Sequence, residues 1–229
     1  MYVIENSPDA RRFRLTNPTG YALTYNGVVM AAEKRRANGW QAFASYTWSK
    51  AYGLLPSSNA SAAGAQTSTV SPPQVSTLGR DPNDLTNARG LLPNDRPHIV
   101  RLMGSVDVPR TGFVLAANLQ QFSGKPWTAA TQLTLPQGAQ RVLLEPRGSR
   151  RLSSQTLLDM RLSKAITVGK LGRIDLMLDV LNLLNDTAEE SLATETLMTE
   201  TVFSPTFGQP VSFVDPRRAM ISVRLNLGR

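Results

Sequence analysis

The sequence of 229 residues contains no cysteine and a single histidine, His98. The missing cysteines exclude a disulfide framework and a cysteine-based metal site. His98 has no second histidine with which to share a metal ion, and the sequence also lacks HExxH, glycine-rich phosphate-binding and nucleophile-elbow motifs. We therefore expect no catalytic, cofactor-binding or metal-ligating residue, and we expect that the protein is not an enzyme.

One acidic stretch contains oxygen ligands of the kind that bind a cation. Asp81, Asn83 and Asp84 loosely suggest Ca²⁺ ligands, but their spacing does not fit an EF-hand loop. Short polar side chains in a long connection more commonly solvate a loop, so we expect these three residues to be solvated.

Long hydrophobic runs are also missing. No stretch approaches the ~18 consecutive apolar residues of a membrane helix, and the mean hydropathy is -0.20. This does not exclude a membrane β-barrel, because its strands alternate apolar and polar residues and average out near neutral. Residues 1–6 lack a basic region followed by an apolar one, so no secretory signal is expected there. If the protein is exported, we expect this chain to lack its beginning.

The basic charge is high but dispersed. The formal net charge is +8, and the basic residues cluster only at residues 34–36, 150–151 and 217–218. A nucleic-acid-binding protein would concentrate them on one helix or face, so we expect no nucleic-acid partner. A solvated face, a wet barrel interior and contact with anionic lipid headgroups stay open as explanations.

The strongest pattern is an alternation of apolar and polar residues with period two. It predicts strands over residues 25–36, 40–52, 98–108, 113–120, 158–167, 173–180 and 221–227, and residues 11–16 could add one more. These runs approach the ~9–11 residues with which a tilted strand crosses a bilayer, whereas globular strands are nearer ~5–6. The predicted fold is therefore an all-β, antiparallel transmembrane β-barrel segment of about seven or eight long strands.

Short and long connections alternate between the predicted strands. Residues 37–39, 109–112 and 168–172 form short turns, the first around Asn38-Gly39, which favours positive φ angles. Residues 53–97, 124–155 and 185–216 form long segments rich in Ser, Thr, Pro, Asn and Gly. Outer-membrane barrels combine short periplasmic turns with long extracellular loops, so the final strand, from Arg217, is expected to end on the periplasmic side.

The aromatic residues fall near the strand ends. Trp40 and Phe113 directly follow short turns, whereas Trp48, Tyr52 and Trp127 lie towards the opposite ends. A barrel places aromatic girdles at both headgroup levels. Ordinary core aromatics of a β-sandwich are the alternative.

The polar positions of the strands carry charges of both signs. If the last short hairpin folds about Lys170, Arg161 and Asp179 come close to opposite each other. A water-filled or plug-filled interior could accept such charges, and so could the solvated face of a sandwich sheet. The charged positions are Arg101, Asp107, Asp159, Arg161, Arg173, Asp175, Asp179 and Arg224.

Four stretches resemble the C-terminal barrel of TonB-dependent receptors, most closely the Oar-like group with a carboxypeptidase-regulatory-like front domain. The first runs from Tyr25 through the Asn38-Gly39 turn to Lys50. The second contains Asn94-Asp95-Arg96-Pro97-His98 and continues to Trp127. The third is Asp179-Val180-Leu181-Asn182-Leu183-Leu184-Asn185, similar to the family's Asn-Leu-Phe-Asn signature, and the fourth runs from Phe207 through Asp215-Pro216-Arg217-Arg218 into the final strand.

The resemblance implies an outer-membrane transporter of a Gram-negative bacterium that binds an unidentified ligand outside and draws energy from the TonB complex. Its partners would be outer-membrane lipid and lipopolysaccharide, the remainder of the barrel, and the plug. The family's barrel has about 22 strands around a plug. We therefore expect residues 1–229 to be an incomplete C-terminal portion, without plug or signal peptide. The chain departs from the family by ending Leu227-Gly228-Arg229 where an aromatic residue is usual.

Two alternatives to a transporter fragment remain at this point. A complete outer-membrane barrel of about eight strands could serve as an adhesin, a structural protein or a narrow pore. A soluble β-sandwich or lipocalin-like binding module would instead protect Leu115, Leu119, Leu176 and Leu178 from solvent.

Overall fold

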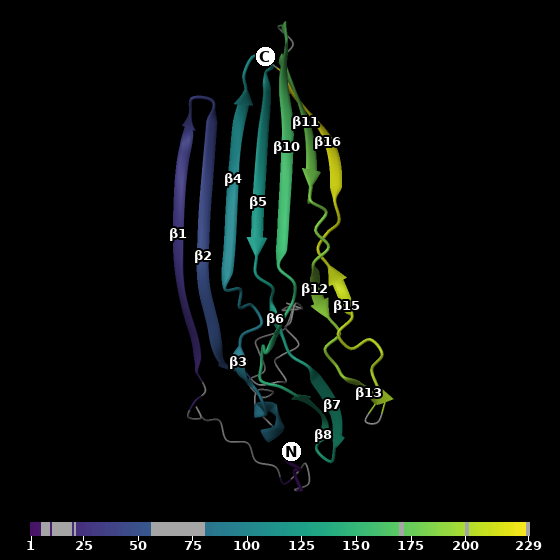
Figure 1. Ribbon diagram of the computed structural model, residues 1–229. Helices are drawn as coiled ribbons and strands as arrows, with labels where there is room; N and C mark the ends of the chain where they lie inside the picture. The colour runs from purple at the N-terminus through teal and green to yellow at the C-terminus, as the bar shows by residue number, and fades with distance from the viewer. Residues whose placement is uncertain are drawn as a thin grey trace.

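The computed structural model describes residues 1–5, 10, 20, 22–55, 81–169, 172–199 and 202–227. One antiparallel sheet dominates it, with seven long strands side by side in the order β1-β2-β4-β5-β10-β11-β16 (Figure 1). A short strand, β3 (Arg89–Leu91), pairs with the end of β2. The long strands are β1 (Leu23–Ala37), β2 (Trp40–Leu54), β4 (His98–Val108), β5 (Phe113–Phe122), β10 (Gln155–Val168), β11 (Gly172–Leu181) and β16 (Arg218–Leu227).

The seven strands predicted from alternation are confirmed, β4 with its predicted bounds. The long strands contain 10–15 residues, which is enough to cross a bilayer at a tilt. Several extend beyond the predicted runs because pairing continues where the apolar pattern has already faded. The further strand considered over residues 11–16 lies outside the described residues, and β3 supplies the eighth strand instead.

The three short turns lie at one end of the sheet and the long connections at the other (Figure 1). Asn38 and Gly39 have φ angles of 54° and 78°, as the two central residues of a type I′ turn require. In the second turn, Arg110 and Gly112 also have positive φ angles. At the third turn, Leu227 of β16 pairs with Gly172, so the final strand ends at the short-turn end as predicted.

The register keeps two chemically different faces continuous across the whole sheet. One row joins Trp40, Val106, Leu115, Leu162, Leu178 and Ile221 through successive strand pairs, and we call this side the apolar face. The neighbouring row joins Gln41, Ser105, Ala116, Arg161, Asp179 and Met220, and we call that side the polar face. Because side chains alternate along each strand, one register sets both faces at once.

The apolar face is uncovered by the described part of the chain. Leu176, Leu178 and Ile221 are 39%, 41% and 82% exposed. A soluble sandwich would bury these side chains against a second sheet, so that alternative is wrong for this chain. An exposed apolar surface of this extent is typical of contact with lipid or another protein.

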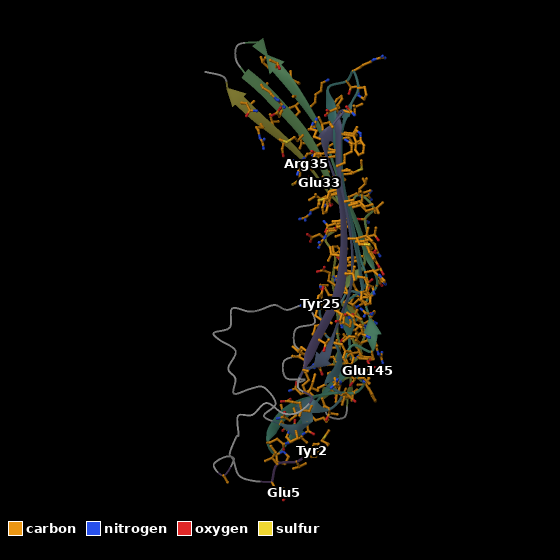
Figure 2. The ribbon with its side chains drawn as sticks, turned by 90° about the vertical axis from the view of Figure 1, so that its left-hand side faces the viewer. Tyr2, Glu5, Tyr25, Glu33, Arg35 and Glu145 are labelled. Atoms are coloured by element: carbon orange, nitrogen blue, oxygen red, sulfur yellow. The ribbon has the colours of Figure 1, made fainter. Side chains whose placement is uncertain are left out.

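The sheet is curved rather than flat. Figure 2, a side view, shows the strands near the C-terminal edge curling to one side, and Glu33 and Arg35 of the polar face lie on that side. Among the described residues, β1 and β16 each pair with one neighbour only, so the sheet is an arc and not a closed barrel. The predicted incomplete barrel is therefore confirmed. No helix in the described ranges is long and apolar enough to cross a membrane.

The described parts of the long connections contain more regular structure than the sequence suggested. Short strands fold them into a layer at one end of the sheet, which we call the loop layer (Figure 1). Most of the buried apolar side chains lie there, including Ala130, Val142 and Leu143. Its strands are β6 (Pro126–Trp127), β7 (Ala130–Leu135), β8 (Gly138–Leu143), β9 (Arg150–Arg151), β12 (Glu189–Leu192), β13 (Leu197–Thr199), β14 (Val202–Phe203) and β15 (Pro210–Phe213).

The first turn gives a direct test of how the register is set. Gly39→Val places a β-branched residue at a φ angle of 78°, where such side chains are strained, so we expect it to lower the free energy of unfolding by about 2 kcal/mol. The measurement is the denaturant midpoint of the protein in detergent. The control, Asn38→Gly, tolerates the same backbone and should leave the midpoint nearly unchanged. Equal midpoints for both variants would contradict the prediction.

Candidate functional site

The polar face carries a hollow of about 620 Å³ near the middle of the long strands. It lies between β1, at one edge, and β10 and β11, towards the other, and Figure 2 shows its β1 side chains Glu33 and Arg35. Carboxylates, guanidinium groups and amides line it together with apolar residues such as Phe43, Met103 and Leu181, so it offers hydrogen-bonding groups to water or to a polar ligand. The polar lining residues are Glu33, Lys34, Arg35, Gln41, Ser105, Asn118, Asp159, Arg161 and Asp179.

An ion pair forms one wall of this hollow. Arg161 Nε lies 2.5 Å and Nη2 3.1 Å from the two carboxylate oxygens of Asp179, across the hairpin of β10 and β11. The pairing predicted from the sequence is therefore confirmed, and the two residues are direct partners in the register. The Asp179 side chain is only 8% exposed, so its charge depends on the bidentate guanidinium for compensation.

Asp159 connects the hollow with a second one nearer the loop layer. The second hollow measures about 380 Å³ and shares Asp159 and Leu181 with the first. One oxygen of Asp159 accepts the backbone N–H of Asn182 at 2.9 Å, which fixes the carboxylate at the junction. Glu190 and Asp215 line the second hollow, so polar groups continue from the loop layer to mid-strand.

The remaining charges predicted for the polar positions also face this side. Arg36 binds both carboxylate oxygens of Asp107 at 2.5 and 2.6 Å, and Arg173 lies 2.5 Å from Asp175. Arg224 is the register partner of Asp175. The Arg101 guanidinium lies 5.8 Å from the ring centre of Phe122. Most carboxylates here therefore have a basic or amide neighbour. The polar face carries many charged groups, and most of its negative charges are compensated.

The Asn94–His98 stretch connects neighbouring strands through side-chain hydrogen bonds. Asp95 accepts the backbone N–H of Ala51 at 2.6 Å and Arg151 at 2.5 Å, and its side chain is only 1% exposed. Arg96 reaches over the Phe122 ring and donates to Gln155 Oε1 at 3.1 and 3.2 Å. The sequence marked this stretch only through its family resemblance, and no local pattern revealed these roles.

Arg147 organises the loop layer. Its Nε donates to the carbonyl of Ala88 at 3.0 Å and its Nη2 to that of Leu55 at 2.5 Å, while its own carbonyl accepts the N–H of Leu91 at 3.1 Å. Burial, together with the nearby Arg141 charge, lowers the pKa of the Arg147 guanidinium to about 10. Arg147 therefore stays charged at neutral pH and ties together segments separated by more than fifty residues. No local sequence pattern indicates this role of Arg147.

The acidic stretch at Asp81 was predicted wrongly. Asp81, Asn83 and Asp84 are 4%, 1% and 4% exposed, so they do not solvate a loop. Asp81 Oδ1 accepts the backbone N–H of Asn83 at 2.8 Å and caps a short 3₁₀ turn, Pro82–Leu85. The Asn83 amide exchanges two hydrogen bonds with the backbone of Tyr2, a contact that no local pattern encodes. Within the described ranges, no three His, Cys, Asp or Glu side chains are arranged to hold a metal ion.

The predicted aromatic girdles are only partly supported. Trp40 begins β2 and Tyr52 lies near its other end, both on the apolar face and about two-fifths exposed, whereas Trp48 lies near the middle of the strand. Trp127 is not at the end of a long strand, as was predicted. It lies in β6 within the loop layer, where its ring centre is 6.1 Å from that of Phe207 and 5.0 Å from the guanidinium of Arg150.

Together, a curved antiparallel sheet of bilayer-length strands, an uncovered apolar face and a hollowed polar face define the wall of a transmembrane β-barrel. The family described as "Outer membrane beta barrel domain" matches residues 3–140, more than half of the chain. The chain belongs to this family, and the protein is located in the outer membrane.

A solved structure is similar to this chain, that of the ferripyoverdine receptor of the outer membrane of Pseudomonas aeruginosa bound to ferripyoverdine. The identity is 14% and the TM-score 0.48, and the match covers 89% of this chain but 19% of the receptor chain. The chain thus spans about a fifth of the receptor's length. No curated protein matches the chain.

The contacts of Asp95 can be tested by substitution. Asp95→Ala leaves the Arg151 guanidinium and the Ala51 N–H without their acceptor, so we expect the free energy of unfolding to fall by about 3 kcal/mol. Asp215→Ala is the matched control, because its pair with Arg218 is 77% and 56% exposed, and it should cost less than ~1 kcal/mol. Denaturant midpoints in detergent provide the comparison, and equal losses would refute a special role for Asp95.

Proposed function

We propose that this protein transports a ligand across the outer membrane as a TonB-dependent receptor of the Oar-like group, with residues 1–229 forming the C-terminal part of its barrel. One observation carries the proposal: the polar face is continuous over seven strands and hollowed from the loop layer to mid-strand. Charged side chains within the membrane are costly unless they face water or protein. A polar interior occupied by water, a plug or a passing ligand satisfies that requirement.

The loop layer supports the same proposal. A receptor that captures its ligand outside the cell needs extracellular loops of defined shape, because ordering them on binding would reduce the affinity. Here the loops are fixed by short strands, by Arg147 and by the ion pair of Arg141 with Glu195 at 2.6 Å. In this proposal the loop end is extracellular and the short turns are periplasmic.

The partners follow from the same proposal. The hydrogen-bonding edges of β1 and β16 would join the remainder of the barrel, a plug would fill the interior, and the TonB complex would supply energy through the plug. Outer-membrane lipid and lipopolysaccharide would cover the apolar face. We propose transport rather than an enzymatic reaction or nucleic-acid binding, and the chemical nature of the ligand stays open.

The test uses the intact gene product in Gram-negative cells. Because the chain contains no cysteine, Ser105→Cys introduces a thiol from this chain only at the hollow of the polar face. A membrane-impermeant maleimide should label it several-fold faster in cells with a functional TonB complex than in cells lacking TonB, since energised movement of the plug would open the interior to the reagent. The readout is labelling of the folded protein.

Leu102→Cys is the control, because Leu102 lies on the apolar face and should resist the water-soluble reagent in both strains. Ser105→Cys labelling that is rapid and independent of TonB would overturn the proposal in favour of a small open barrel acting as a pore. No labelling in either strain would also contradict it, because the polar face would then not line a wet interior.

A further inference from the structure

The two basic residue types on the long strands are separated between the two faces of the sheet. The three lysines, Lys34 of β1, Lys50 of β2 and Lys164 of β10, are on the apolar face. Lys34 pairs with Ala42 and Lys164 with Phe113, and Lys50 follows Trp48 at the next same-face position of β2. The arginines of the register are on the other side. Arg101, Arg161, Arg173, Arg218 and Arg224 occupy polar-face rows.

This separation has a chemical basis. Arginine suits the polar face because its planar guanidinium binds carboxylates through two hydrogen bonds, as Arg161 does with Asp179. Lysine has a flexible apolar stem, which can lie along an apolar surface while the ammonium reaches a polar layer. The ammonium of a lysine on a lipid-facing surface can therefore contact lipid headgroups.

Each of the three lysines lies over an aromatic ring. The ammonium of Lys34 is 3.9 Å from the ring centre of Trp40, that of Lys164 is 4.6 Å from Phe113, and that of Lys50 is 5.8 Å from Tyr52. A ring attracts a cation but does not neutralise it. The register of the described long strands places no Asp or Glu on the apolar face, so no carboxylate of these strands neutralises the lysines there.

Two of these pairs are at the short-turn end. Lys34 and Lys164 stand three and four positions before the ends of β1 and β10, and Trp40 and Phe113 begin the strands that follow two of the turns. The ammonium of Lys34 also donates to the carbonyls of Ala37 and Trp40, at 3.1 and 3.4 Å, so it points towards the turn and away from mid-strand. Aromatic rings beside strand ends occupy the headgroup level of a bilayer.

We propose that Lys34 with Trp40, and Lys164 with Phe113, form two binding sites for the phosphate of anionic phospholipids in the leaflet at the short-turn end. The ammonium binds the phosphate, the ring holds the lysine stem in place, and the surrounding apolar face contacts the acyl chains. Charge complementarity selects an anionic lipid over a zwitterionic one. This inference goes beyond the transport function and does not depend on the ligand or on TonB.

The test is native mass spectrometry of the intact gene product in detergent. Phosphatidylglycerol should bind in preference to phosphatidylcholine of the same chain length, with up to two tightly held copies. Lys34→Gln combined with Lys164→Gln should weaken phosphatidylglycerol binding on the order of ten-fold, since each lysine near an anionic lipid surface contributes to attraction. Lys34→Arg with Lys164→Arg keeps both charges and should retain the preference.

Lys125→Gln with Arg150→Gln is the matched control, because it removes two charges from the loop layer and leaves the apolar face intact. Inorganic phosphate at millimolar concentration should not displace the lipid, and displacement would mean that the sites take a free anion instead. Equal binding of both lipids by the unaltered protein overturns the proposal without any variant. Unchanged binding by the double glutamine variant, or an equal loss in the control, overturns it as well.

Discussion

A slip of one residue between any two neighbouring strands would exchange the two faces of every strand beyond the slip, because side chains alternate with period two. Tight turns fix the register of β1 with β2, β4 with β5, and β10 with β11. The interfaces β2–β4, β5–β10 and β11–β16 join strands that are far apart in the sequence. Side-chain hydrogen bonds at the loop end align them: Asp95 joins β2 to the start of β4, Arg96 reaches β10, and Asn182 binds the carbonyl of Asp215 before β16.

The stretches that resemble TonB-dependent receptors coincide with these alignments. Asp95 and Arg96 belong to the second stretch, Asn182 to the third and Asp215 to the fourth. Their described contacts are with backbone groups and neighbouring strands, not with the hollows alone. The residues that carry the resemblance are therefore those that align neighbouring strands of the wide curved sheet. In the proposed transporter the loop layer and the interior would select the ligand, so the resemblance carries little information on it.

The features that the sequence predicted depend on contacts between residues close in the sequence, whereas the features that it did not predict depend on contacts between distant residues. Alternation predicted the seven strands, Asn38-Gly39 predicted its turn, and the opposition of Arg161 and Asp179 followed from the length of one hairpin. These are local relations. The burial of Asp81, the place of Trp127 and the role of Arg147 depend on contacts such as Tyr2 with Asn83 or Arg147 with Ala88, across tens of residues. No periodic pattern encodes such contacts, so the structure of the loop layer could not be predicted from the sequence.

Hydropathy alone separates the two faces imperfectly. Phe43, Met103 and Met177 lie in polar-face rows, so apolar side chains occur on both sides of the sheet. The type of charge separates the faces more sharply: in the described register, carboxylates and paired arginines occupy one side and lysines over aromatic rings the other. Short carboxylates can neither extend to the headgroup layer nor gain from its phosphates, whereas lysine can do both. The two faces thus differ in the charged groups that their surroundings can compensate.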